Sequence, residues 1–304
     1  MGAPTPASAG LLETGSLTIG STVEPGVVPG ALPPGVNTCS TYNGVTVCNV
    51  HAGHQVQIGS CSACVSSVNG VIHLRGVRDR LTLGGTAWSV PSGRFGTEWI
   101  GIEIDSEIVQ AGYLYSDVAL TGCSSDTGGV VKMFVYAIAS DGSTYCHLYG
   151  SGVSLGDVHD FKIERCDTST NSTTWCFYID GNYETKFDPG FGSGDASPAL
   201  GEWYCQSAST TCPTSSSELD ADYGGSANPW AVTGCTADGC TPGEVDWQTV
   251  ASSDQYVYDD SCFAVNGQGP DYNTYNWSIG NFSSSSAYHV DWPGTTYNPP
   301  GFTC

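Results

Sequence analysis

The chain has 304 residues, and its 30 Asp and Glu residues against 8 Lys and Arg give a formal net charge of −22 at pH 7 and a pI near 4.1. This balance argues against a nucleic-acid partner, whose phosphates need clustered Lys and Arg, and against binding to an anionic membrane surface. It indicates either a soluble, self-repelling secreted protein or adaptation to acid, because about half of the carboxylates are protonated near pH 4.

The first segment, residues 1–37, is rich in Pro, Gly, Ser and Thr, with Pro33-Pro34-Gly35 near its end. This composition predicts an extended arm or linker. If the arm is ordered, we expect it to lie along an edge strand of its own sheet or of a neighbour's, which makes self-association a possible partnership. The sequence contains no apolar run of about 18 residues, so no membrane span is expected.

From about residue 43 onward the pattern is typical of short strands separated by turns, with no helical window. Residues 98–104 alternate, with three isoleucines on one face and Trp99, Gly101 and Glu103 on the other. Asp180-Gly181-Asn182 predicts a tight hairpin. The other expected strands are 45–50, 55–58, 70–74, 81–90, 130–139, 158–165, 173–180, 183–187, 245–250, 255–258, 275–279 and 288–291.

Regularly spaced strands with Gly-rich turns predict an all-β protein, a two-sheet antiparallel β-sandwich or jelly roll of concanavalin-like type. We expect a single sandwich domain over residues 38–304. From about residue 205 the chain is expected to form a loop-rich, Cys-rich extension, because 205–244 holds four cysteines and three prolines.

The 14 cysteines are even in number, which points to disulfides and a secreted, extracellular protein. Their spacing suggests four local pairs, although sequence alone does not give connectivity. Cys61-Ser62-Ala63-Cys64 has the spacing of a zinc or redox motif, but it has no second CxxC partner, so a disulfide is favoured. The suggested local pairs are Cys39/Cys48, Cys166/Cys176, Cys205/Cys212 and Cys235/Cys240.

Two residues have side chains suited to peptide hydrolysis in acid, Gln110 and Glu202. Hydrolysis by water needs a group that removes a proton from water, a group that stabilises the oxyanion and a group that protonates the leaving amine. One carboxyl group can perform both proton transfers, and an amide donates to the oxyanion without titrating. Gln110 and Glu202 divide the work in this way if their strands are neighbours, and the chemistry requires no metal or cofactor.

The order of short motifs around these residues resembles the eqolisin family of glutamic peptidases. The similarity covers residues 80–206 and rests on five segments taken in order. They are Ser89–Ser92 (SVPS), Thr97–Ile102 (TEWIGI), Ile108–Gly112 (IVQAG), Gly156-Asp157, and Ala199–Trp203 (ALGEW). The resemblance implies a β-sandwich with an acid pH optimum, a polypeptide substrate, and Gln110 and Glu202 as the catalytic pair. It also implies that Trp99 and Trp203 shape a substrate cleft, and Glu103 beside them is a further candidate for substrate binding.

The sequence departs from the family pattern at several positions. The reversal after the WxGI strand is Glu103–Glu107, shorter than in the family. The aromatic strand between the catalytic partners is Phe134–Ala137 and lacks its Trp. Gly201 replaces an Ala before the Glu, and Gln206 stands where the family commonly has a second Glu.

Each of these residues also has a plainer interpretation. In this interpretation Gln110 is an ordinary solvent-facing strand residue, Glu202 is one surface acid among many, and Trp99 is a core aromatic. Glu103, Asp105 and Glu107 form an acidic hairpin tip that is expected to be solvated, with calcium as the less favoured alternative. His51 and His54 are considered as a metal pair and disfavoured.

Two other classes of function remain open. One is a carbohydrate-binding or carbohydrate-hydrolysing sandwich, since the chain has 33 aromatic residues (9 Phe, 8 Trp and 16 Tyr) to stack on sugars. A glycosidase needs two facing carboxyl groups, and Glu103 or Glu164 is then the expected partner of Glu202. Alternatively it is an extracellular structural or assembly protein, with a degenerate peptidase fold and an arm that completes a neighbour's sheet.

Overall fold

The computed structural model describes residues 39–292, except for a set of gaps, and the arm expected at residues 1–37 lies outside this range. The side chains of residues 39–50, 203–205, 257–259, 278–279 and 291–292 are also outside the description. The gaps are 43–44, 62–63, 86–87, 89–94, 105–106, 117–122, 124–127, 140, 151, 168–171, 206–218, 238–243, 260–277 and 280–286.

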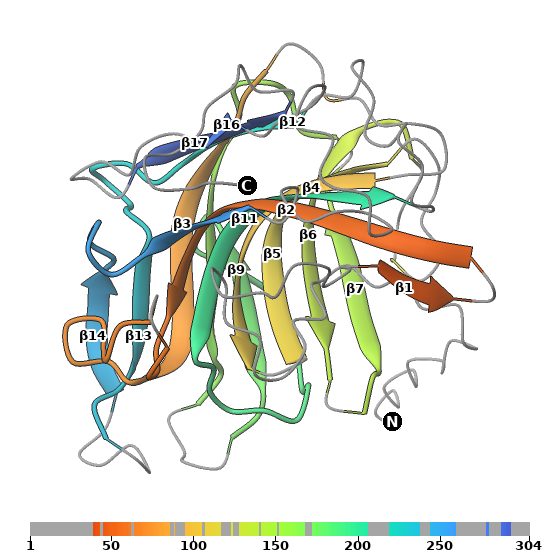
Figure 1. Cartoon of the computed structure of the whole chain (residues 1–304). Helices are drawn as coiled ribbons and strands as arrows, with labels where there is room; N and C mark the ends of the chain where they lie inside the picture. The colour runs from red at the N-terminus through yellow and green to blue at the C-terminus, as the bar shows by residue number, and fades with distance from the viewer. Residues whose placement is uncertain are drawn as a thin grey trace, which may run out of the picture.

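The described chain is all-β, a two-sheet antiparallel sandwich of jelly-roll type, as the strand pattern predicted (Figure 1). None of its described segments is helical, and so none is a helix that could span a membrane. The two sheets pack face to face, with β3 against β4 and β8 against β5. We call the sheet that contains β4 and β5 the front sheet, and the sheet that contains β3 and β8 the back sheet.

The front sheet has eight strands in the order β1-β2-β11-β4-β5-β6-β7, with β15 paired to β2. Every pair in it is antiparallel. Its strands are β1 (Cys39–Tyr42), β2 (Val45–Gln57), β4 (Phe95–Ile104), β5 (Glu107–Ser116), β6 (Val131–Ile138), β7 (Thr144–Tyr149), β11 (Ala196–Cys205) and β15 (Tyr256–Asp259).

The back sheet has nine strands in the order β10-β9-β8-β3-β12-β17-β16, and β13 pairs with both β3 and β14. Its strands are β3 (His73–Leu83), β8 (Val158–Arg165), β9 (Trp175–Ile179), β10 (Asn182–Phe187), β12 (Leu219–Tyr223), β13 (Ala231–Cys235), β14 (Glu244–Thr249), β16 (Ser278–Ile279) and β17 (Tyr288–Trp292).

The apolar core divides into two clusters because side chains alternate between the faces of each strand. Ile100 and Ile102 of β4 point to the inner face and pack with back-sheet residues such as Val77 and Phe161. Trp99 belongs to a second buried cluster on the outer face of the front sheet. The alternation expected for residues 98–104 is therefore confirmed, and both faces of the front sheet are buried.

The predicted hairpin and one predicted disulfide are confirmed. Asp180 and Gly181 link β9 to β10 with φ angles of 52° and 77°, the positive values that a tight two-residue hairpin requires. Cys166 is bonded to Cys176 as expected. Cys61 is bonded to Cys64, which confirms a disulfide in place of zinc.

The other cysteines are only partly covered by the description. Cys123 is bonded to Cys146, a pair that spacing did not suggest. Cys39 lies opposite Cys48 in the β1–β2 register. Cys235 is disulfide-bonded. The predicted pairs of Cys235 with Cys240 and of Cys205 with Cys212 each involve a residue outside the described ranges.

Much of the segment expected as a loop-rich extension belongs to the sandwich itself. After residue 205, β12, β13 and β14 join the back sheet and β15 joins the front sheet. Leu219 and Val232 are fully buried in the core. Short strands rich in Gly, Thr and Asp escaped the sequence pattern because their burial comes from long-range pairing with β3.

Candidate active site on the front sheet

The strand register places Gln110 and Glu202 on the same face of the front sheet. β4 lies between β11 and β5, and it pairs Thr97 with Glu202 on one side and Gly101 with Gln110 on the other. Directly paired residues share a face, and Thr97 and Gly101 are an even number of positions apart. Both predicted catalytic side chains therefore project from the outer face, separated by one strand.

No hydrogen bond joins the side chains of Gln110 and Glu202. The ring of Trp99, on β4, lies on the outer face between the two strands that carry them. Both amide atoms of Gln110 lack a hydrogen-bond partner among the described residues. A Cβ placed on Gly101, directly opposite Gln110, would lie 2.9 Å from Trp99 Cζ3, so the indole ring leans over this glycine. The arrangement leaves an amide and a carboxyl group on either side of an aromatic ring.

Glu202 is enclosed by two neighbours on adjacent strands. Its Oε1 lies 3.3 Å from Nε2 of His51 on β2, and Thr97 on β4 donates its hydroxyl to Oε2 at 3.4 Å. All three side chains are fully buried. The plain interpretation of Glu202 as a surface acid is therefore wrong. A substrate can reach its carboxyl group only if the atoms that bury it move aside.

Gln110 is fully buried too, so its interpretation as a solvent-facing strand residue is also wrong. It lies next to Tyr136 in the β5–β6 register. Trp99 Nε1 and the hydroxyl of Tyr256 also lack hydrogen-bond partners in the described part of the chain, and both residues belong to or pack against the outer-face cluster. Burying an unsatisfied polar atom costs about 1–3 kcal/mol, so such groups commonly mark a functional site.

Glu103 lies on the same face, two residues beyond Gly101 in β4, and it is 8% exposed. The expectation that this residue sits in a solvated hairpin tip is therefore wrong. Burial is the main reason that the pKa of Glu103 is raised to about 8; His51 acts to lower this pKa, and the charges of Asp195 and Glu202 act to raise it. Glu103 thus holds a proton at neutral pH and adds a second carboxyl group to the face that carries Glu202.

The raised pKa of Glu103 predicts a pH-dependent stability that a Gln substitution removes. Between about pH 4.5 and pH 8 the unfolded chain loses the Glu103 proton while the folded chain keeps it, so stability falls as pH rises. We expect Glu103→Gln to make this slope less negative by up to about 1.4 kcal/mol per pH unit. Urea unfolding at pH 5, 6, 7 and 8 measures the slope, and identical slopes for both proteins would contradict the burial of an acid here.

Two stacked tyrosines from the back sheet fix β11 just before Glu202. The rings of Tyr223 and Tyr288 lie 4.7 Å apart with an interplanar angle of 7°. The Tyr288 hydroxyl donates to the Ala199 carbonyl at 2.9 Å, and the Tyr223 hydroxyl lies 2.8 Å from the Leu200 carbonyl. Burial raises the pKa of both phenols well above the ordinary value, so they remain neutral donors.

The remaining predicted site residues are placed as follows. Trp203 follows Glu202 in β11, and its side chain is outside the description. His51 and His54 lie on opposite faces of β2, because His54 contacts the ring of Tyr288 at the inner face. Among the described residues no group of three or more His, Cys, Asp or Glu side chains is arranged to hold a metal ion.

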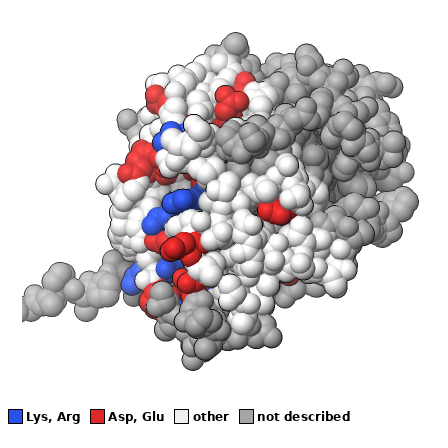
Figure 2. All heavy atoms as spheres, turned by 90° about the vertical axis from the view of Figure 1, so that its left-hand side faces the viewer, with Lys and Arg blue, Asp and Glu red and all other residues white. Residues whose placement is uncertain are grey.

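Glu164, the other expected partner for Glu202, belongs to the back sheet. It accepts a hydrogen bond from Lys162 Nζ at 2.6 Å. Arg75 forms a similar pair with Glu244 at 3.2 Å. Figure 2 shows basic and acidic side chains side by side on one face of the molecule, in keeping with such pairs. Glu164 therefore plays no part at the outer face of the front sheet.

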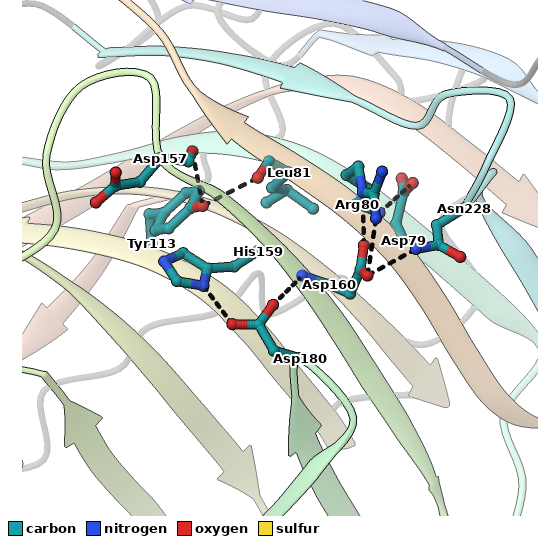
Figure 3. A network of polar contacts seen from close by, with 9 residues as sticks. All are labelled: Asp79, Arg80, Leu81, Tyr113, Asp157, His159, Asp160, Asp180 and Asn228. Atoms are coloured by element: carbon teal, nitrogen blue, oxygen red, sulfur yellow. Dashed lines mark hydrogen bonds and ion pairs between the residues drawn. The ribbon is translucent and has the colours of Figure 1, made fainter.

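A second polar network lies on the back sheet (Figure 3). Arg80 makes two bonds to Asp160, at 2.7 and 3.0 Å, and Asn228 donates to the same carboxylate at 2.6 Å. His159 Nδ1 lies 2.7 Å from Asp180. These contacts join β3 to β8 and β8 to the turn between β9 and β10.

The Gly156-Asp157 step of the resemblance forms a turn before β8. Ser154 N donates to the Asp157 carboxylate at 2.8 Å, and Leu83 N donates to the Asp157 carbonyl at 3.0 Å. The Tyr113 hydroxyl, from β5, donates to the Leu81 carbonyl at 2.9 Å (Figure 3). These contacts join the turn and β5 to β3, which gives the motif a structural role.

Comparison with known proteins assigns no family to the chain. No protein-family model and no curated protein matches the sequence.

Similar solved structures include an alginate lyase from Alteromonas sp. 272, at 11% identity over 44% of this chain and 51% of that chain, with a TM-score of 0.27. Galectin LEC-6 of Caenorhabditis elegans matches at 11% identity over 49% of this chain and 88% of that chain, with a TM-score of 0.25. A family 16 endo-glucanase from Bacteroides ovatus matches at 10% identity over 56% of this chain and 71% of that chain, with a TM-score of 0.29. Similarity at this level carries no conclusion about substrate or activity.

Proposed function

We propose that the outer face of the front sheet is the active site of a secreted, acid-acting endopeptidase of glutamic type. The observation that supports this proposal is the projection of Gln110 and Glu202 from one buried face, with Trp99 on the face between their rows. These are the residues that the resemblance to eqolisins implies, and β4 brings them together from distant parts of the sequence.

In the proposed reaction Glu202 removes a proton from water as the water attacks the peptide carbonyl. The same carboxyl group then delivers this proton to the leaving amine, so the proton balance closes without a second acid. The Gln110 amide nitrogen donates to the oxyanion, and this nitrogen has no hydrogen-bond partner among the described residues. An amide keeps this ability at any pH, whereas a His in the same place would be charged in acid.

Digestion of unfolded protein over pH 2–7 tests the proposal. We expect cleavage between about pH 2 and 5 that resists pepstatin, chelators and thiol reagents, because the chemistry uses neither an Asp pair, a metal nor a Cys. Absence of cleavage at every pH, or loss of cleavage on chelation, would contradict the proposal. Because Glu202 is closed to solvent, the assay should include a long incubation in acid before substrate is added.

A second candidate, a carbohydrate hydrolase, is favoured by the position of Glu103. Its carboxyl group shares the outer face with Glu202, the two charges influence each other, and a pKa of about 8 makes Glu103 a proton donor at neutral pH. A protonated and an ionised carboxyl group on one face are the requirement for glycoside hydrolysis.

The two candidates are distinguished by the substrate that is cleaved and by the variant that loses activity. A carbohydrate hydrolase would release sugars from a panel of polysaccharides and would lose this activity in Glu103→Gln while keeping it in Gln110→Ala. A peptidase would lose its activity in Gln110→Ala and keep it in Glu103→Gln, because the Gln110 amide stabilises the oxyanion only in the proposed peptide hydrolysis.

A further inference from the structure

His51 is the side chain that most closely approaches the proposed catalytic carboxyl group. The β2–β11 register pairs His51 directly with Glu202, and both side chains are fully buried. His51 Nε2 lies 3.3 Å from Oε1, and the other carboxylate oxygen faces the Thr97 hydroxyl. Each oxygen of Glu202 therefore has one protein neighbour, and one of these neighbours can carry a positive charge.

The charge of an imidazole depends on pH in the range that matters for this site. Histidine is neutral above roughly pH 6.5 and positively charged below it. A buried carboxylate next to a cation is stabilised in its ionised form, whereas burial alone favours the protonated form. The proposed hydrolysis needs an ionised Glu202 to accept a proton from water, and this need is greatest in acid.

Several other titratable groups lie near this pair or on the reverse face of the same strands. Glu103 on β4 interacts with His51, but below about pH 8 its carboxyl group is protonated and therefore neutral. Asp195, just before β11, and Tyr256, on β15, lie near Glu103. On the reverse face of the same strands, Glu98 bonds with Tyr223 and His54 with Gln255. Glu202 lies within ion-pair distance of His51, at 3.3 Å.

We propose that His51 is a positioning residue that keeps Glu202 ionised in acid and so sets the lower pH limit of the activity. The inference rests on the proposed function for its effect on catalysis. It does not follow from the resemblance, because His51 lies outside the matching segments.

The pH profile of kcat/KM tests the effect of the charge. His51→Gln keeps a hydrogen-bond donor but removes the positive charge, so we expect the acid limb to move up by about one pH unit, which is roughly a tenfold loss at pH 3. The value near pH 5 should change little, and KM should stay close to that of the wild type. His159→Gln is the matched control, because it removes another carboxylate-paired histidine on the back sheet. A wild-type acid limb in His51→Gln would overturn the inference.

A second measurement needs no activity. NMR titration of the His51 ring in the full-length chain should show its titration midpoint fall by at least about one pH unit in Glu202→Gln, because the anionic partner is gone. An unchanged midpoint shows that the two groups are not coupled and refutes the inference. If Glu202→Gln keeps full activity, the proposed function fails. If that variant is inactive while His51→Gln keeps the wild-type acid limb, the inference alone fails.

Discussion

Glu202→Gln is expected to lower kcat for protein hydrolysis by at least about 10³-fold, because one carboxyl group performs both proton transfers in the proposed reaction. The substitution nearly preserves the shape of the side chain, so Thr97 can still donate to it and the fold should persist. Single-turnover cleavage of an unfolded substrate at about pH 3.5 measures the loss. Far-UV circular dichroism and a urea midpoint establish that the variant is folded.

Glu164→Gln provides the matched control for this experiment. Glu164 is also a glutamate in a central strand, but it lies on the back sheet and pairs with Lys162. Its substitution should leave kcat unchanged within about twofold, in line with the small contribution of surface ion pairs. Equal losses in both variants would show that the effect comes from a general disturbance of the sandwich and not from the chemistry of Glu202.

A large effect on stability is expected at Gly112, two residues after Gln110. A Cβ at this position would lie 2.1 Å from the Glu98 carbonyl oxygen and 2.7 Å from the Trp99 Cα. Both atoms belong to the backbone of β4, so the strands must separate to admit a methyl group. We expect Gly112→Ala to destabilise the fold by about 3 kcal/mol, the upper end of the range for overpacking.

Urea denaturation of Gly112→Ala against Gly59→Ala measures this effect. A Cβ at Gly59 meets nothing closer than the Cys64 sulfur at 3.5 Å, an ordinary contact, so the control should lie within about 0.5 kcal/mol of the wild type. If Gly112→Ala matches the control, β4 and β5 are not as close as the structure has them. The geometry of the outer face that carries Trp99 and Gln110 would then need revision.

The architecture was predictable where the signal was local. The alternation of residues 98–104 and the Asp180-Gly181 turn depend on side chains a few positions apart, and both are confirmed. β12 and β13 were missed because each is only five residues long and their burial depends on pairing with the distant β3. Cys123 and Cys146 were not paired for the same reason, since β6 intervenes between them.

The candidate site was predictable in part. Gln110 and Glu202 stand out from the sequence because each sits in a short motif, and the register places both on one face. Nothing local revealed that His51 faces Glu202, because β2 and β11 are far apart in the chain. The burial of Glu103 was not predicted either, because an acid-rich turn is expected to be solvated unless the residues that pack against it are known.

The kcat/KM of Gln110→Ala on unfolded protein at about pH 3.5 tests the central claim most directly. The account predicts a loss of about 10²- to 10³-fold, because the variant lacks the amide that stabilises the oxyanion. It also predicts that a Gln110→Ala/Glu202→Gln double variant is little worse than Glu202→Gln alone, since the two groups act together. A Gln110→Ala variant with wild-type activity, beside a Glu103→Gln variant that has lost it, would contradict the account and assign the site to a pair of carboxyl groups.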